Sequence, residues 1–490
     1  DTIPQGARAD YVLANPSIID GFDYIFKYAD SVGKPAVINL SWGMHTGPHD
    51  GTSLFDQALD ALVGTGKIIV GSAGNERGRW MHFDHNFSGD TVSTWAGENI
   101  RRDETFESIY VDFWGSPSTE FSLQMVMVDS SSAILGQSGW VSSTQEGTHA
   151  FEIVSGNDTV TVTFECDSAS VLNDKPNILV QANNNHPLNS YMVLRATSLN
   201  TSLNGWNSGG VDRYTSGGFN NLIKGSQPFS NMKAGNDNTS VGENGGTAER
   251  VITVGAYATS FTWLNAFGGT LSTFAYPGYL ANFSSMGPTV DGRIKPDVVS
   301  PGITVSSAFN RYAIDPFSLS YISTVNGTTD FYGVLSGTSM AAPQVTGIVA
   351  LMLEQNPALT PETVRSILQQ TAAKDTFTKT TPNNLYGWGK VDALAALQAV
   401  KGNTGLKGVL QSAGIQVFPN PSSDVVKIAI LNGDNQIIRC DILTIEGRKV
   451  KEQSVNGNET VIQVKDLATG VYLLQIETAE GAHILRFVKQ

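Results

Sequence analysis

Residues 333–347 constrain the fold of this chain most, because a glycine-rich turn there opens a helix that is apolar nearly all round. The apolar positions that follow cover more than one face of a 3.6-residue helix: Val345, Ile348, Val349, Leu351 and Met352. We therefore expect a buried helix whose first turn alone is exposed. Gly337 lets the backbone turn tightly before this helix, and Thr338 and Ser339 supply hydroxyl groups.

Ser339 lies in the expected first turn of this helix. N–H groups of a first turn have no intrahelical acceptor, and the positive end of the helix dipole favours a developing oxyanion. This place suits a nucleophile, but a serine that merely caps a helix is the commoner case. The local pattern leaves both interpretations open.

Length and charge bound the class of protein. With 490 residues the chain has room for about three domains with buried cores. A net charge of −14, an isoelectric point near 4.9 and the lack of any basic run argue against nucleic acid or an anionic membrane as partner. We find no apolar stretch that could span a bilayer and no signal peptide, and we interpret residues 1–4, which lack an initiating Met, as a trimmed or cleaved start.

Apolar runs and helical patterns alternate along residues 1–78. A short apolar run at 9–14 predicts a strand, spacing over 18–32 predicts a helix, and 36–40 reads as a buried strand. An amphipathic helix over 55–63 and a strand at 68–70 follow. This alternation predicts an α/β core with a parallel sheet that is covered on both faces.

The pattern changes to two-residue alternation within residues 79–246, where clusters of Ser, Gly, Asn and Asp separate the apolar runs. The alternating positions lie at 109–113, 121–127, 151–153 and 160–164. We predict an inserted all-β domain, jelly-roll-like, with an irregular loop over 205–246 that returns to the core.

Residues 247–402 return to the α/β pattern. A strand is expected at 251–254 and another within 295–307, before the helix that carries Ser339. Thr360 and Pro361 open a helix that reaches residue 372, and a last helix covers 391–400. Residues 403–413 read as a linker, and 414–490 as a small β-sandwich. Cys166 and Cys440 fall in different predicted domains, so we expect two buried, unpaired thiols.

The segment Gly337-Thr338-Ser339-Met340-Ala341-Ala342-Pro343 resembles the nucleophile segment of the subtilisin-like serine peptidases, or subtilases. Further segments resemble the blocks of that family in the expected order, at residues 37–43, 69–76, 251–256, 283–288, 295–302 and 386–393. The resemblance implies that Ser339 is the nucleophile and that the Asn75 amide joins the Ser339 N–H in an oxyanion hole. Without it, Asn75 in a glycine-rich loop would be taken for a turn former.

The same resemblance implies that two segments hold the substrate strand and wall the first specificity pocket. These residues are Ser41, Trp42 and Gly43, and Ser72, Ala73 and Gly74. Glu76 then lies either at the rim of that pocket, where it would favour basic residues, or in an exposed loop. We take the exposed loop as the expectation.

Two other regions carry resemblances of their own. The β insert is similar in architecture to the insert of clostridial germination proteases of the Csp type, and it can bind carbohydrate or protein or simply brace the core, which is our expectation. The last eighty or so residues, with Pro419-Asn420-Pro421 and Gly470-Val471-Tyr472, resemble the C-terminal sorting domain of the type IX secretion system of Bacteroidota. A plain immunoglobulin-like stalk is the alternative. The sorting domain implies a location outside the outer membrane, secreted or on the cell surface.

The Asp and His blocks of the family are not found in this chain. His45 follows the substrate-edge block, whereas the family's His opens a helix before it, so His45 cannot be the base. The chain is then the product of a nick that stays bound to an N-terminal fragment, part of an active enzyme, or a pseudopeptidase. We expect a secreted serine endopeptidase acting on protein or peptide substrates, inactive as this chain alone, with a pseudopeptidase or a binding scaffold as the alternative.

Short-spaced histidines raise the question of a metal site. His45 and His49 are four residues apart, and His82 and His85 flank Asp84. Neither pair has a third clear ligand, and calcium, common among subtilases, has no evident ligand cluster here. We therefore expect no metal and no cofactor.

Overall fold

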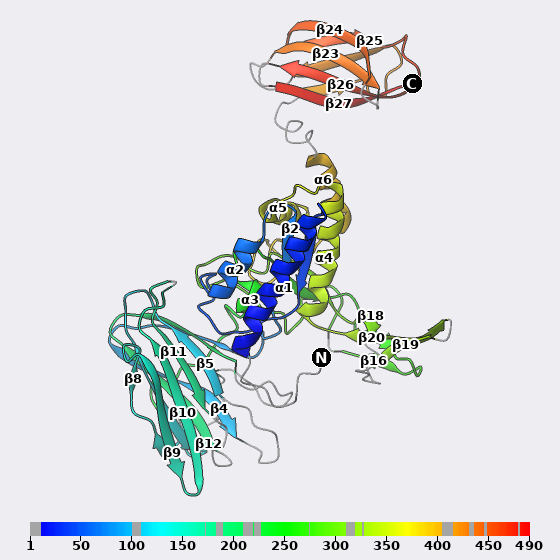
Figure 1. Ribbon diagram of the computed structural model, residues 1–490. Coiled ribbons are helices and arrows are strands. Elements are labelled where there is room, and N and C mark those ends of the chain that lie inside the picture. Colours follow the sequence, from blue (N-terminus) through cyan, green and yellow to red (C-terminus); the bar gives the residue numbers. More distant parts are fainter. Residues whose placement is uncertain are drawn as a thin grey trace. The chain divides into compact units, whose positions relative to one another are not determined.

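The computed structural model describes residues 11–99, 109–171, 173–182, 190–208, 219, 227–273, 275–309, 319–325, 328–403, 415–430, 436–444, 448–478 and 481–490 (Figure 1). The chain divides into two compact units, residues 1–396 and 397–490, and each is described by itself. None of the described helices is long and apolar enough to cross a lipid bilayer.

The first unit is built on a parallel sheet of four strands in the order β1-β2-β14-β17. The strands are β1 (Ala36–Leu40), β2 (Lys67–Ser72), β14 (Ile252–Ala258) and β17 (Val298–Ile303). β2 and β14 form the interior of the sheet, and Ile68, Ile69 and Val254 are fully buried. The predicted parallel sheet is therefore confirmed.

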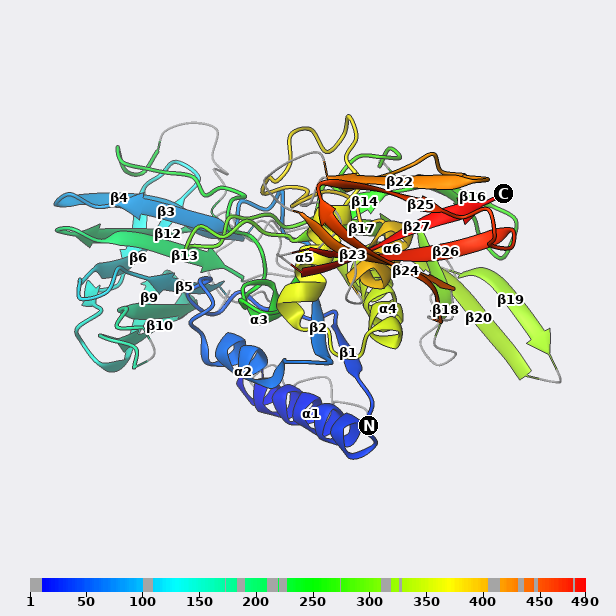
Figure 2. The same ribbon diagram turned by 90° about the horizontal axis from the view of Figure 1, so that it is seen from above.

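The described residues contain six helices: α1 (Tyr11–Ser31), α2 (Leu54–Leu62), α3 (Glu243–Gly246), α4 (Thr338–Gln355), α5 (Pro361–Thr371) and α6 (Ala393–Asn403). α4 contacts all four strands, whereas α1 lies beside α2 (Figure 2). Thr360 caps α5 as predicted, since it accepts the Thr363 N–H, and Ser53 caps α2 by accepting the Asp56 N–H.

Two predictions about these helices are wrong. Residues 11–14 belong to α1 rather than to a strand, while residues 9 and 10 lie outside the described part; a short apolar run is compatible with either element. α4 is also not buried all round, because the sheet covers its Val345 and Val349 side while Leu351 remains 47% exposed. An apolar surface predicts burial only when the fold supplies a cover for every side of it.

Strands β3–β13 form an all-β insert of two antiparallel sheets. The first has the order β3-β13-β5-β11-β10-β9 and the second β4-β12-β6-β7, with β8 paired to β6. Their bounds are β3 His82–Asn86, β4 Asp90–Asn99, β5 Ile109–Trp114, β6 Ser122–Asp129, β7 Ile134–Gln137, β8 Val141–Ser142, β9 Gly147–Ser155, β10 Asp158–Asp167, β11 Asn177–Ala182, β12 Ser190–Ser198 and β13 Ser202–Asn207. The strands predicted at 109–113, 121–127, 151–153 and 160–164 are β5, β6, β9 and β10.

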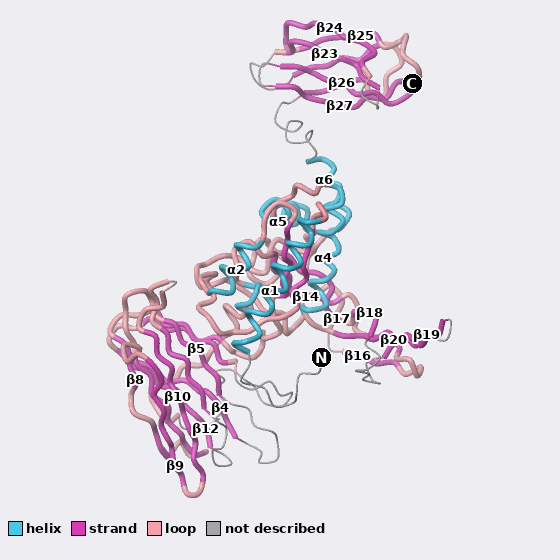
Figure 3. Tube along the Cα trace, viewed as in Figure 1, coloured by secondary structure: helices cyan, strands magenta, loops and turns pink. Residues whose placement is uncertain are grey.

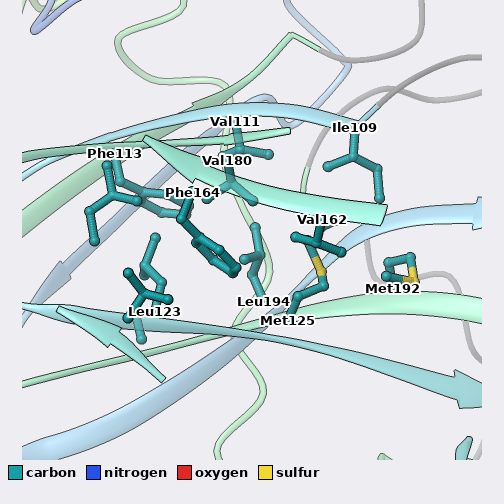
Figure 4. Packing of buried hydrophobic residues seen from close by; sticks show 14 of the residues in the cluster. Ile109, Val111, Phe113, Leu123, Met125, Val162, Phe164, Val180, Met192 and Leu194 are labelled. Carbon is teal, nitrogen blue, oxygen red and sulfur yellow. The ribbon is translucent and has the colours of Figure 1, made fainter. Parts of the chain in front are cut away.

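Alternating side chains of the two sheets meet in the core of the insert (Figure 4). Phe113, Phe164 and Val180 come from one sheet, and Leu123 and Leu194 from the other, all at most 1% exposed. This is the packing that a period of two predicts. The predicted return loop is wrong at its start, because residues 205–207 are part of β13; Gly205 lies under the ring of Phe113, where a larger side chain would collide.

Two antiparallel ribbons extend the core without a clear signal in the sequence (Figure 3). One pairs β15 (Thr262–Leu264) with β16 (Thr270–Ser272). The other has the order β18-β20-β19, formed by β18 (Val305–Phe309), β20 (Thr328–Leu335) and β19 (Leu319–Val325). Since β20 ends at Leu335, this second ribbon leads directly into the turn before Ser339.

The second unit contains two antiparallel sheets, β21-β22-β25 and β24-β23-β26-β27. The strands are β21 Ile415–Phe418, β22 Val425–Ile430, β23 Ile437–Thr444, β24 Lys449–Gly457, β25 Glu459–Gln463, β26 Gly470–Thr478 and β27 Gly481–Lys489. Val426, Ile442 and Phe487 lie fully buried in its core. Of the predicted linker 403–413, only residue 403 is described, at the end of α6. Cys166 and Cys440 are both free and buried, one in each unit, as expected.

A buried ion pair joins the sheet to α5. Lys295 Nζ lies 2.9 Å from Asp297 Oδ2, and the two side chains are 3% and 4% exposed. Asp297 Oδ2 also accepts the Thr253 N–H of β14 at 2.8 Å, and its Oδ1 accepts Gln369 Nε2 of α5 at 3.2 Å. One carboxylate thus connects β14, β17 and α5.

We expect Asp297→Asn to lower the free energy of unfolding by about 3–5 kcal/mol, because it leaves the Lys295 ammonium buried without its counter-charge. Asp30→Asn is the matched control: the Lys67–Asp30 pair is as close, 2.6 Å, but its side chains are 28% and 58% exposed. That change is expected to cost less than about 1 kcal/mol. Equal losses in urea unfolding of the two variants would contradict the assignment.

Candidate active site

Ser339 is the second residue of α4, directly after the turn that follows β20. The Gly337 N–H donates to the Gly302 carbonyl at 2.8 Å, which ties this turn to the end of β17. Ser339 is half-buried, and its carbonyl accepts the Ser41 hydroxyl at 2.9 Å. Its N–H belongs to the first helical turn, where no intrahelical acceptor exists.

Asn75 follows β2 and reaches the start of α4. Its Oδ1 accepts the Thr338 N–H at 2.9 Å and the Thr338 hydroxyl at 3.1 Å. Because a backbone N–H requires an acceptor, this bond fixes which end of the carboxamide is oxygen. The part of the chain that the structure describes shows no acceptor for either N–H of the Asn75 amide, so both can serve another acceptor. Thr338 was not singled out by its sequence context, apart from its hydroxyl.

Two of the predicted substrate-edge residues contact the start of α4, and the other four differ in their burial and their own contacts. Ser41 contacts Ser339, and Gly74 donates its N–H to the Thr338 hydroxyl at 3.1 Å. Ala73 is fully buried, and both its N–H and its carbonyl are used, by Val254 and Gly242. Ser72 is 8% exposed, Gly43 is exposed, and Trp42 packs beside Phe55 with ring centroids 6.3 Å apart.

The expectation that Glu76 lies in an exposed loop is wrong. Its side chain is 21% exposed and bends toward Ser285, whose hydroxyl donates to Oε2 at 2.9 Å. His45 Nε2 lies 3.4 Å from the same oxygen. Burial opposes ionisation of this carboxyl, but the hydrogen bond and charge of His45 outweigh it, so the pKa of Glu76 lies below its ordinary value.

Three of the four closely spaced histidines form one stack of rings with a tryptophan. The His45 and His49 rings are nearly parallel, and their centroids are 5.5 Å apart. The ring centroid of Trp206 lies 4.0 Å from that of His49 and 5.1 Å from that of His82. We call these four residues the ring column. His85 instead pairs with Asp90 on the surface. In the described ranges no group of three His, Cys, Asp or Glu residues is placed to hold a metal ion.

The ring column joins the core to the insert. His45 and His49 follow β1, whereas His82 and Trp206 belong to β3 and β13. The junction is sealed by further bonds, since the Gly47 N–H donates to Asp112 Oδ2 at 2.7 Å and Asn173 donates to the Thr52 hydroxyl. The sequence indicates each histidine but not their meeting, because they come from segments far apart in the chain.

His49 is fully buried beside two buried carboxyl groups. The ring nitrogen Nδ1 of His49 is 2.9 Å from the Val241 carbonyl oxygen, and the backbone N–H of His49 donates to Glu243 Oε2 at 2.7 Å. Burial, reinforced by His45, holds the pKa of His49 well below its ordinary value. Burial together with the Asp56 charge raises the pKa of Glu243 well above its own, and burial raises the pKa of Asp56 to about 8. We expect a neutral imidazole beside protonated carboxyl groups at neutral pH.

Residues 227–389 match the Subtilase family, and residues 416–490 match the secretion system C-terminal sorting domain. The sorting domain indicates type IX secretion to the cell surface or beyond. Serine protease AprX of Bacillus subtilis is 39% identical over 150 residues, which are 30% of this chain and 30% of AprX. Bacillopeptidase F of Bacillus subtilis is 34% identical over 128 residues, 26% of this chain and 8% of that protein.

A solved structure extends the likeness to most of the chain. The structure of the Clostridium perfringens CspB protease has a TM-score of 0.55 at 21% identity and covers 79% of this chain and 72% of that one. At this identity the likeness shows a shared fold. The matched part of the present chain spans less than a third of the length of AprX and about half, 54%, of the uncharacterized protein aq_aa18 of Aquifex aeolicus.

The buried side chains of His49 and Glu243 make the stability of the fold depend on pH in opposite directions. Below its ordinary pKa of about 6.5, an unfolded histidine binds a proton that folded His49 rejects, so its contribution to stability falls as pH drops from 6.5. Folded Glu243 keeps a proton that the unfolded side chain, with an ordinary pKa of about 4.5, has lost. Its contribution therefore falls as pH rises above 4.5. The two slopes oppose each other between about pH 5 and 6.5.

We expect His49→Gln and Glu243→Gln to tilt the pH profile of stability in opposite directions. When the pH falls from about 6.5 to 5, His49→Gln is expected to lose less free energy of unfolding than the wild type, by up to about 1.4 kcal/mol per pH unit. Glu243→Gln is expected to lose more than the wild type. Urea unfolding at the two pH values measures this. His85→Gln on the surface is the control, and a shift of the same sign in both test variants would refute the assignment.

Proposed function

Because the chain contains a subtilase-family domain and a C-terminal sorting domain, we propose that it is part of a secreted serine endopeptidase that cleaves peptide bonds through an acyl-enzyme on Ser339. One observation carries the proposal: Asn75 at the end of β2 is hydrogen-bonded to Thr338, the residue before Ser339. This bond sets an amide donor next to a serine that opens a helix, and these are the two groups that an oxyanion site needs.

The chemistry then follows from the arrangement. The Ser339 hydroxyl oxygen attacks the carbonyl carbon of the substrate peptide while a base takes its proton. The negative charge that develops on the carbonyl oxygen is stabilised by the Ser339 N–H and the Asn75 amide. The amine leaves with a proton from the base, and water then hydrolyses the ester. Ser41, Trp42 and Gly43 on one side and Ser72, Ala73 and Gly74 on the other are the proposed substrate edges.

The general base is proposed to be a His, paired with an Asp, on a polypeptide segment outside the described residues. Within the described ranges of the first unit, His45, His49 and His82 are held in the ring column. His85 pairs with Asp90, and His149 Nε2 lies 2.8 Å from the Gln145 carbonyl. These engagements leave none of the five for Ser339, whose hydroxyl is a weak nucleophile without a base.

The free edge of β1 supports a place for such a segment. β1 stands at the end of the four-stranded order, and no described strand pairs with its outer edge. Strands of parallel sheets are normally covered on both faces, yet Asn39 of β1 is exposed. Tyr28 of α1, 61% exposed, and Leu351 of α4, 47% exposed, add uncovered apolar surface. We propose that the segment with the Asp and His adds strands to this edge, as an N-terminal fragment or as part of the same protein.

Finer points stay predictions. These are the jelly-roll assignment of the insert, an origin in Bacteroidota, export through a signal peptide, and the inactivity of this chain by itself. A scaffold or pseudopeptidase role remains the alternative, and the next experiment separates it from the enzyme.

We expect a fluorophosphonate probe to label Ser339 when the natural, full-length protein is treated, and Ser339→Ala to abolish labelling. Ser336→Ala is the matched control, since Ser336 is exposed in the same turn and its hydroxyl only accepts the Thr304 N–H. Peptide mapping by mass spectrometry locates the adduct. Absence of labelling in protein that contains every segment of the natural polypeptide would refute the enzyme and favour the scaffold.

We expect Asn75→Ala to lower kcat by about a hundred- to a thousandfold, as removal of the side-chain donor does in a subtilisin, with KM little changed. Thr338→Val keeps the N–H bond to Asn75 and loses the hydroxyl bond, so about a tenfold loss is expected. Asn265→Ala, in the β15–β16 hairpin, is the control. Steady-state peptide hydrolysis measures all three, and an Asn75→Ala variant with wild-type kcat would remove the residue from the site.

A further inference from the structure

The loop that carries Asn75 is held by hydrogen bonds to residues 283–285. We call residues 74–77 the Asn75 loop. The Gly74 carbonyl accepts the Ser285 N–H at 3.0 Å, and the Glu76 N–H donates to the Ser285 hydroxyl at 3.1 Å. The Arg77 N–H donates to the Phe283 carbonyl at 3.1 Å. Backbone bonds on both sides of Asn75 therefore depend on residues 283–285.

The Glu76 side chain completes this fastening. It folds back against its own loop, so that a Cβ on Gly74 would collide with the Glu76 carboxylate and come 2.8 Å from the Ser285 hydroxyl oxygen. Gly74 also has φ of +109°, a conformation that suits glycine. The carboxylate accepts the Ser285 hydroxyl proton at 2.9 Å. A buried carboxylate at this place needs further partners.

His45 supplies that partner. Its side chain lies 3.4 Å from Glu76 Oε2, and the residue is 8% exposed. Its Nδ1 is buried without a hydrogen-bond partner in the described part of the chain. Nε2 is the ring nitrogen that lies 3.4 Å from Glu76 Oε2, so a proton on Nε2 makes His45 the donor to this carboxylate.

The backbone around His45 is held on both sides. The Met44 carbonyl accepts the Glu243 N–H at 2.8 Å, and the Gly47 N–H donates to Asp112 of the insert. The His45 ring stacks on His49, with 8° between the ring planes. His45 therefore has little freedom to turn away from Glu76, and the contact is set by the fold rather than by a mobile side chain.

We propose that His45 is a positioning residue for the reaction: by donating to Glu76 it holds the Asn75 loop where the Asn75 amide meets the oxyanion. This role rests on the proposed function, and it gives His45 a task other than that of a base. Without the His45 donor, burial favours the protonated form of Glu76. The carboxyl group then loses the charge-assisted interaction that holds it against the loop. A shift of about 1 Å in a positioned donor is enough to cost about a hundredfold in rate.

His45→Phe and His45→Gln separate the donor from the ring. Phenylalanine keeps a ring to stack on His49 but cannot donate to Glu76, so kcat is expected to fall by about tenfold or more while KM stays nearly constant. Glutamine has an amide that can donate to Glu76 and is expected to restore most of kcat. His85→Phe is the matched control, because His85 also pairs with a carboxylate, Asp90, but within the insert.

Amide hydrogen exchange gives a readout that needs no activity. The amides of Gly74, Glu76 and Arg77 are expected to exchange about tenfold faster in His45→Phe than in the wild type, with no change in His85→Phe. Glu76→Gln, which keeps an acceptor for both Ser285 and His45 but loses the charge, is expected to give an intermediate rate. This variant keeps the test valid should His45→Phe fail to fold.

The outcomes distinguish this role from the proposed function. If the wild type is active but His45→Phe keeps its kcat and its exchange rates, the positioning role is wrong. A change only in KM for peptides with basic residues would also overturn it, because Glu76 would then act in a specificity pocket. If the wild-type protein is inactive yet the loop loosens in His45→Phe, the proposed function fails while the fastening of the loop stands.

Discussion

The hydrogen bonds from Thr338 to the Asn75 carboxamide are the interaction on which the candidate site depends. They connect the end of β2 to the start of α4, two points separated by 263 positions in the chain. The parallel sheet makes this possible, because the carboxyl ends of its strands gather at one edge and helix starts lie above them. In the proposed reaction, a donor that is fixed beforehand needs no reorganisation when charge develops, so we expect these hydrogen bonds to affect the rate strongly.

The strands of the parallel sheet differ in how fully they are covered by the rest of the described chain. The interior strands β2 and β14 are almost wholly buried, and the Lys295–Asp297 pair connects β14 to α5. β1, by contrast, has an outer edge without a described partner, and the helices α1 and α4, which contact β1, expose Tyr28 and Leu351. An edge of this kind in a parallel sheet is a template for further strands. The same sheet thus both positions Ser339 and offers a place for the groups that would activate it.

The insert meets the core at side chains whose contact the sequence did not predict. His49 and His82 stack on Trp206, His45 stacks on His49, and His85 pairs with Asp90. Burial lowers the pKa of His49 and of His82, which favours uncharged rings at the centre of this junction. The position of Glu76 beneath its own loop follows from this junction, because His45 reaches it from the ring column.

The sequence by itself determined the parallel core, the antiparallel insert and the capped α5, since period, turn residues and Thr360 act locally. It also pointed to Ser339, Asn75 and the sorting domain through family motifs. Only the tertiary structure decided that residues 11–14 are helical, that Leu351 stays exposed, that Glu76 is folded inward and that His45 joins His49, Trp206 and His82. The exposure of Leu351 and the places of Glu76 and His45 depend on what covers a side chain, and that cover comes from segments distant in the sequence, which no local pattern records.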